Sequence, residues 1–160
     1  MNTLVVYYSR TGTTRTVAEK VGQALGATVE ELIDTKNRKG PVGLLAAGKD
    51  ALTRKAVPID PMTNDPADFD LVIVGTPVWG GTMSSAVRTF LAEHGGQIRR
   101  AAVFCTTRVS GIDHTLDAMA EMCGGEVVAR VGLREKAVKK DRCGEALDAF
   151  VRDIRSADNS

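Results

Sequence analysis

Cysteine, long apolar runs and a basic leader are scarce or missing in this sequence, and each absence excludes a class of protein. The 160 residues hold three cysteines, which cannot all pair within one molecule, and none is spaced C-x-x-C as zinc sites and thiol exchange require. No apolar run is long enough to cross a bilayer, and no basic segment precedes the first apolar run. We therefore expect a cytoplasmic protein in a reducing compartment, without a membrane span, disulfide or metal ion.

A strong excess of charge of one sign is also missing. Lysine and arginine together number 21, aspartate and glutamate number 20, and the formal net charge is +1. Such a balance produces no overall field of the kind that gathers nucleic acid. We therefore expect no nucleic-acid partner.

Apolar residues are present in short continuous runs that are rich in β-branched side chains. Continuous rather than alternating apolarity is typical of strands that are covered on both faces, as in a parallel sheet. A weaker candidate strand lies at residues 28–33. The four clear runs are Leu4–Tyr8, Leu71–Val74, Ala101–Cys105 and Val127–Leu133.

Segments with the apolar spacing of a helix separate these runs. Strands that alternate with helices predict right-handed βαβ units in an α/β domain, with helices on both faces of a parallel sheet. A chain of this length can form one core, and we place the domain at residues 1–156, followed by a flexible tail at residues 157–160. The helical segments are residues 17–25, 87–91, 112–123 and 147–154.

Residues 36–61 are harder to assign. Residues 44–52 form an apolar-faced helix candidate that Gly48 interrupts, and Pro58 and Pro61 predict an irregular connection. Six basic residues gather between positions 36 and 55, where they provide either a solvated face or a docking site for an acidic partner.

The clearest functional signal follows the first predicted strand, where hydroxyl side chains surround a glycine. Hydroxyls and the free N–H groups of a helix start can hold phosphate oxygens, glycine permits close backbone approach, and the helix dipole favours an anion. An ordinary Ser/Thr helix cap would explain one or two of these hydroxyls, so phosphate binding is the stronger interpretation. The segment comprises Ser9, Arg10, Thr11, Gly12, Thr13 and Thr14.

A second segment follows the strand at residues 71–74, and we expect it to be a loop. In an open parallel sheet, ligands bind outside the carboxyl ends of the strands, where the direction of winding reverses. Trp79 is the only tryptophan and lies between Pro77 and two glycines, so a planar ring ligand can stack on it. The alternative is an indole that packs over a helix end.

These segments resemble the flavodoxins. Residues 9–14 match the S/T-x-T-G-x-T phosphate loop of that family, and residues 74–79 with the helix at 87–91 look like its second flavin loop. Residues 103–111 are similar to the loop that closes over the flavin. The resemblance implies a flavodoxin-like three-layer sandwich, with a five-stranded parallel sheet in the order 2-1-3-4-5 and FMN at its carboxyl edge.

The resemblance also implies a role for each segment in holding FMN. Residues 9–14 would bind the phosphate, the second segment would flank the ring, and the third would cover its pyrimidine end. The resemblance implies no catalytic residue and no metal ligand. The implied ring contacts are Thr76, Pro77, Val78, Trp79, Gly80, Gly81, Thr106, Thr107, Arg108 and Gly111.

Three departures from the flavodoxins bear on function. The third segment lacks the second aromatic that flavodoxins commonly place there, so the ring would be more open to a substrate. Flavodoxins are usually strongly acidic, whereas this chain is nearly neutral, which argues against a carrier steered to basic partners. Arg108 near the pyrimidine carbonyls would stabilise negative charge on the reduced ring, although an exposed loop arginine is an equally good interpretation.

Three functions remain open at this point. The first is electron transfer by an FMN-binding protein that works with a separate redox partner. The second is an oxidoreductase that reduces FMN or quinones with NAD(P)H. The third is a non-redox module that binds another phosphorylated ligand.

Overall fold

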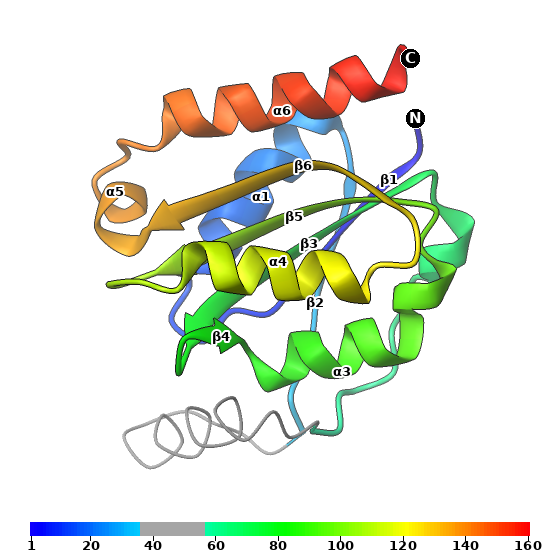
Figure 1. Ribbon diagram of the computed structural model, residues 1–160, viewed down its shortest axis with the longest axis horizontal. Coiled ribbons are helices and arrows are strands. Elements are labelled where there is room, and N and C mark those ends of the chain that lie inside the picture. The colour runs from blue at the N-terminus through cyan, green and yellow to red at the C-terminus, as the bar shows by residue number, and fades with distance from the viewer. Residues whose placement is uncertain (36–56) are drawn as a thin grey trace.

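Five parallel strands form the central sheet of the protein, in the order β2-β1-β3-β5-β6 (Figure 1). The computed structural model describes residues 1–35 and 57–160. Counted along the chain, the order of these parallel strands is 2-1-3-4-5, which confirms the predicted three-layer α/β architecture. The strands are β1 (Thr3–Tyr7), β2 (Thr28–Glu31), β3 (Leu71–Trp79), β5 (Arg100–Thr107) and β6 (Glu126–Arg134).

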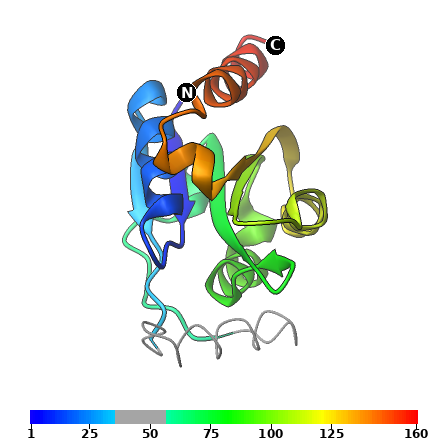
Figure 2. The same ribbon diagram turned by 90° about the vertical axis from the view of Figure 1, so that its left-hand side faces the viewer.

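Helices cover both faces of this sheet (Figure 2). The first and last helices, α1 and α6, lie on one face, and α3 and α4 lie on the other. Among the helices of the described residues, none is both long and apolar enough to cross a membrane. The helices are α1 (Thr13–Leu25), α3 (Ser85–His94), α4 (Ile112–Met122), α5 (Glu135–Lys139) and α6 (Gly144–Asp158), with short 3₁₀ turns at Pro66–Asp68 and Gly95–Gln97.

The sheet divides the core into two layers, because successive side chains of a strand point to opposite faces. In β1, Leu4 and Val6 pack on the side of α3 and α4, whereas Val5 and Tyr7 pack on the side of α1 and α6. All five residues of β1 are buried. Burial on both faces explains why the central strands have continuous apolar sequences rather than alternating ones.

The structure differs from the predicted elements after Val74. The sequence predicts a loop there, but β3 continues to Trp79 and turns through Gly80 and Gly81 into a short antiparallel strand, β4 (Thr82–Met83). Both glycines have positive φ angles, 57° and 77°, which suit a two-residue hairpin turn and which other residues adopt at a cost. Trp79 therefore lies at the end of a strand and is held by its pairing with Thr82.

Two other elements differ in extent from the prediction. Helix α6 ends at Asp158, inside the segment 157–160 that we expect to be a tail. Helix α5 has no counterpart in the prediction, because five residues are too few to show a helical apolar pattern. The helix predicted at residues 44–52 and the basic cluster between positions 36 and 55 lie outside the described residues.

The three cysteines are unpaired and buried in the core. Burial raises the pKa of the Cys105 thiol to about 12 and that of the Cys123 thiol to about 11. Thiolates are therefore scarce at these positions at neutral pH, and we assign the cysteines to packing rather than to chemistry.

Gly75 lies directly against an aromatic ring, which leads to a prediction about stability. A Cβ atom at this position would lie 2.0 Å from Cζ of Phe104, its partner on the adjacent strand. Because Phe104 is fully buried and cannot move away freely, Gly75→Ala should lower the free energy of unfolding by about 1–3 kcal/mol. Chemical denaturation followed by circular dichroism measures this change.

Gly96→Ala is the matched control, because nothing lies within 4 Å of a Cβ added at that glycine. Its free energy of unfolding should change by less than about 1 kcal/mol. An equal loss of stability in both variants would contradict the packing argument.

Candidate functional site

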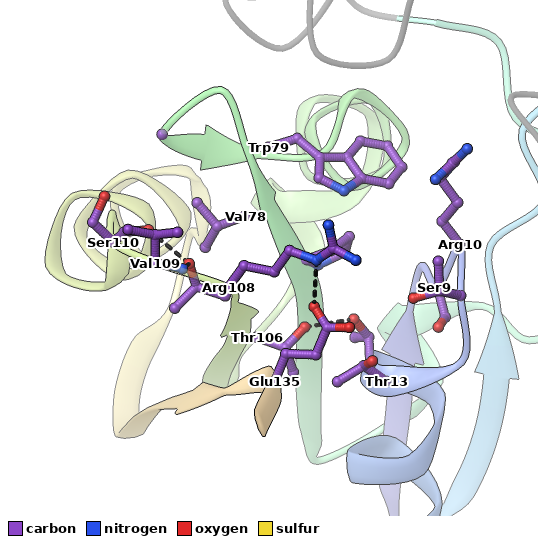
Figure 3. A pocket seen from close by; sticks show the side chains of 15 residues that line it. Ser9, Arg10, Thr13, Val78, Trp79, Thr106, Arg108, Val109, Ser110 and Glu135 are labelled. Atoms are coloured by element: carbon purple, nitrogen blue, oxygen red, sulfur yellow. Dashed lines mark hydrogen bonds and ion pairs between the residues drawn. The ribbon is translucent and has the colours of Figure 1, made fainter. Parts of the chain in front are cut away.

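The ends of β1, β3 and β5 enclose a cavity of about 290 Å³ at the carboxyl edge of the sheet (Figure 3). This volume is close to the lower end of the range for small-molecule sites. The three predicted segments meet at this cavity, together with one residue that follows β6. The lining residues are Ser9, Arg10, Thr11, Thr13, Thr14, Pro77, Val78, Trp79, Gly81, Thr106, Thr107, Arg108, Val109, Ser110 and Glu135.

Four predicted site residues do not line the cavity but shape its walls. Gly12, Gly80 and Gly111 all have positive φ angles and form turns at its edge. Thr76 is fully buried, and its hydroxyl accepts a hydrogen bond from the Ser84 amide at 2.9 Å. Since Ser84 is the N-cap residue of α3, Thr76 fixes the start of that helix.

The first segment presents an uncapped helix start to the cavity. Gly12 is the N-cap residue of α1, with a φ of 98°, and no side chain caps this helix. The Ser9 hydroxyl instead accepts a hydrogen bond from the Gly12 amide at 3.1 Å, and the Thr16 hydroxyl donates to the Gly12 carbonyl at 2.9 Å. The structure therefore does not support the helix-cap interpretation of these hydroxyls. The first N–H groups of α1 remain available to an anion at the positive end of the helix dipole.

A buried pair of hydroxyls joins the first segment to the end of β5. Thr14 Oγ1 and Thr106 Oγ1 lie 2.9 Å apart, and both residues are almost completely buried at the base of the cavity. Each hydroxyl has one hydrogen to donate, and the bond between them uses only one of the two. The pair therefore keeps one O–H that can donate to a ligand.

Trp79 forms the wall opposite these hydroxyls, and Tyr8 fixes its orientation. The two rings meet edge to face, with centroids 5.4 Å apart and an interplanar angle of 84°. Figure 3 shows the indole over the cavity, with Arg10 and Arg108 on different sides of it. The indole is thus placed to contact a ligand in the cavity, as the stacking interpretation requires.

The third segment folds into a tight turn against the β3–β4 hairpin. The Thr107 hydroxyl donates to the Ser110 carbonyl at 2.7 Å, and Gly111, with a φ of 93°, begins α4. A Cβ atom at Gly111 would lie 3.0 Å from Cγ1 of Val78 and 3.3 Å from the Gly81 backbone. Glycine at this position therefore allows the second and third segments to approach closely.

Sequence reasoning missed three residues of the cavity: Val109, Ser110 and Glu135. The first two lie between predicted residues, but Glu135 follows β6 and belongs to none of the three segments. Glu135 Oε2 accepts a hydrogen bond from Arg108 Nε at 3.0 Å, while its other oxygen lies 2.5 Å from Lys139 Nζ. Its place directly after a parallel strand, at the same sheet edge as the predicted loops, is the signal that could have found it.

The ion pairs of Glu135 keep it charged. The hydrogen bond from Lys139 lowers the pKa of its carboxyl, and the bond from Arg108 acts in the same direction, against the effect of partial burial. Arg108 itself is 76% exposed, so its guanidinium reaches over the cavity from the third segment while its Nε is held by Glu135. Within the described residues, no group of three histidines, cysteines or acidic residues could hold a metal ion.

Comparisons with known proteins agree with this fold. The family model described as flavodoxin matches residues 2–150. The flavoprotein of Lactobacillus acidophilus NCFM, solved in complex with FMN, is 23% identical, with 87% of this chain and 97% of that chain covered and a TM-score of 0.71.

Two further solved structures are similar over almost their entire length. A flavodoxin of Streptococcus pneumonia TIGR4 is 15% identical, with 98% of this chain and 99% of that chain covered and a TM-score of 0.62. The oxidised Flavodoxin 2 of Bacillus cereus is 16% identical, with 95% and 99% covered and a TM-score of 0.59. At these identities, the structural matches establish the fold.

Proposed function

This chain belongs to the flavodoxin family, and we propose that it binds FMN at the carboxyl edge of its sheet and transfers electrons through it. The observation that carries the proposal is the start of α1, where the N-cap residue Gly12 provides no side-chain cap and four hydroxyl residues of the first segment line the cavity. A phosphate placed there would complete the hydrogen bonding of the helix start. FMN, when bound, supplies one- and two-electron chemistry that no side chain of this protein provides.

The residues of the cavity fit the two ends of FMN differently. The hydroxyls of Ser9, Thr11, Thr13 and Thr14 line the cavity at the start of α1 and would hold the phosphate. Trp79 and the apolar side chain of Val78 would contact the ring and exclude water from one of its faces. The solved flavoprotein of Lactobacillus acidophilus NCFM, which contains FMN, supports this assignment by its similar fold.

An NAD(P)H-dependent oxidoreductase is the second candidate function, and the third segment favours it. Arg108, Val109 and Ser110 are exposed, and no aromatic ring among residues 1–35 and 57–160 closes the cavity on their side. A second planar substrate would therefore have access to the flavin ring. The two candidates share the FMN site and differ in whether a small molecule reduces the flavin directly.

Thr14→Val should weaken FMN binding by roughly 10-fold to 100-fold, because it removes a hydroxyl at the base of the cavity without changing the volume of the side chain. The quenching of flavin fluorescence during titration measures the Kd. Riboflavin serves as the reference ligand, because it lacks the phosphate, and its Kd should change much less.

Thr115→Val is the matched control. Thr115 is equally buried and lies outside the cavity lining, and its hydroxyl has no hydrogen-bond partner within the described residues. Its FMN affinity should equal that of the wild-type protein. If the wild-type protein bound neither flavin, the proposed function would be wrong; equal losses for FMN and riboflavin in Thr14→Val would show that this hydroxyl does not contact the phosphate.

The FMN-loaded protein should be reduced only slowly by NADPH, because we propose an electron carrier that depends on a separate reductase. Stopped-flow absorbance at the flavin band, with NADPH and a soluble quinone present, measures this reaction. Multiple turnovers per second without a reductase would instead assign the protein to the oxidoreductases.

Arg108 and Glu135 should shift the reduction potential of bound FMN in opposite directions. A cation at the cavity stabilises the negative charge of the reduced ring, and a carboxylate destabilises it, by on the order of 1 kcal/mol in a partly solvated site. Arg108→Ala should therefore lower the midpoint potential, and Glu135→Gln should raise it. Spectroelectrochemical titration measures both values.

The exposed ion pair between Arg130 and Asp117 provides the control, because it lies outside the cavity lining. Arg130→Ala and Asp117→Asn should leave the midpoint potential unchanged. If all four variants left it unchanged, the charges of Arg108 and Glu135 would have no influence on the flavin.

A further inference from the structure

Charged residues are unevenly distributed along the chain, although its net charge is nearly neutral. Residues 134–142, which comprise the last residue of β6 and the segment after it, contain five cations and two carboxylates, a net charge of +3. This segment lies at the carboxyl edge, because Glu135 lines the cavity itself. In contrast, residues 57–70, which lead to the amino end of β3, contain four aspartates and no lysine or arginine. The segment beside the cavity is therefore more positive than the chain as a whole.

The two carboxylates of residues 134–142 are already paired. Glu135 binds Arg108 and Lys139, and Asp141 binds Lys20, which adds a further cation to this region. The remaining four cations are exposed and form no ion pair with any residue of 1–35 or 57–160. They are Arg134, Lys136, Lys140 and Arg142. Their positive charge is thus directed to solvent.

These cations lie beside the cavity. Figure 2 views the carboxyl edge, where α5 lies between α1 and the start of α4. Arg108 extends the positive surface across the cavity mouth, and the neighbouring Val109 exposes 71% of its surface. We call residues 134–142 together with Arg108 the basic rim.

We propose that the basic rim docks an acidic redox protein, which exchanges electrons with the flavin at the adjacent cavity. The inference rests on the proposed function, because the cavity must hold FMN. Electron-transfer encounters use small interfaces, and complementary charge increases their association rates more than their affinities. An exposed valine at the cavity mouth supplies apolar contact at the point where the two redox groups approach. Docking of a redox protein also accounts for the place of the rim beside the cavity, which attraction to a nucleic acid or a lipid surface would not require.

Oxidation by an acidic haem protein provides the test. The FMN-loaded protein is reduced under anaerobic conditions by light, with EDTA as the electron donor that is oxidised, and is then mixed with ferric cytochrome b5, which is acidic, or with ferric cytochrome c, which is basic. Two haem irons are reduced from ferric to ferrous for each flavin that loses two electrons, and the protons go to solvent. Absorbance of the ferrous haem gives the second-order rate constant at each salt concentration.

The rate constant with cytochrome b5 should fall as salt rises, because salt screens attraction, and the rate constant with cytochrome c should rise or stay constant. Lys136→Glu/Lys140→Glu reverses two unpaired charges of the rim, and should slow the reaction with cytochrome b5 by roughly 10-fold at low salt. The same variant should accelerate the reaction with cytochrome c. Ratios to the wild-type rate are compared, since the two haems differ in driving force.

Arg99→Glu/Arg152→Glu is the matched control. This variant changes the net charge of the chain by the same amount as Lys136→Glu/Lys140→Glu. Its two exposed positions lie before β5 and on α6, outside the basic rim. It should leave both reactions within about twofold of wild type, because surface charges far from the encounter site are screened. Equal slowing by the two double variants, or a rate with cytochrome b5 that does not depend on salt, would overturn the proposal.

Flavin content and lipid binding are measured on the same variants. The flavin absorbance of each variant, and its bleaching on reduction, show whether the variant still holds reducible FMN. If the wild-type protein showed no flavin absorbance, the proposed function would be refuted together with the docking proposal that rests on it. The wild-type protein could sediment with phosphatidylserine vesicles, and Lys136→Glu/Lys140→Glu could abolish this binding without changing the rates of the haem reactions. That result would assign the basic rim to a lipid surface and overturn the proposal.

Discussion

Gly12 takes a left-handed φ of 98° between β1 and α1, and the geometry of the cavity depends on this turn. Because β1 is buried on both faces, its direction is fixed, and the turn places the start of α1 at the carboxyl edge of the sheet. Gly12 has no side chain with which to cap the helix, so the cap leaves the first N–H groups of α1 without a side-chain acceptor. Ligand binding and the stability of this helix start are therefore linked, because a bound anion would stabilise only the folded state.

Residues behind the cavity hold the side chains that face it. Tyr8 sets the orientation of Trp79, and the bond between Thr14 and Thr106 joins the start of α1 to the end of β5, 92 positions away in the sequence. Thr76 fixes the start of α3 and so the hairpin that carries Trp79. Such support reduces the conformational entropy that the cavity would lose on binding a ligand. The site is built mostly on strand ends and helix starts, which the buried core makes rigid.

Local patterns made the fold predictable, whereas contacts between distant segments did not show in the sequence. The continuous apolar runs identify buried strands, and the hydroxyls around Gly12 lie in one short segment, so both features can be recognised without knowledge of the topology. Helix α5 and strand β4 are too short for a periodic signal. Glu135 was missed because its partner Arg108 is 27 positions away, and only its place just after a predicted strand could have indicated it. The turn at Gly80 and Gly81 was recognisable as a turn, but its hairpin geometry depends on the pairing of β3 with β4.

Net charge is a poor guide to steering, because an approaching partner responds to the charges near its docking point rather than to the sum over the chain. On the docking that we propose, an acidic partner would bring negative charge close to Arg108 and Lys139, which also neutralise Glu135. The reduced flavin carries negative charge, so the approach of further negative charge makes it a stronger electron donor. Docking and electron release would then be coupled through Arg108, which belongs to the basic rim and also stabilises the reduced ring before the partner arrives.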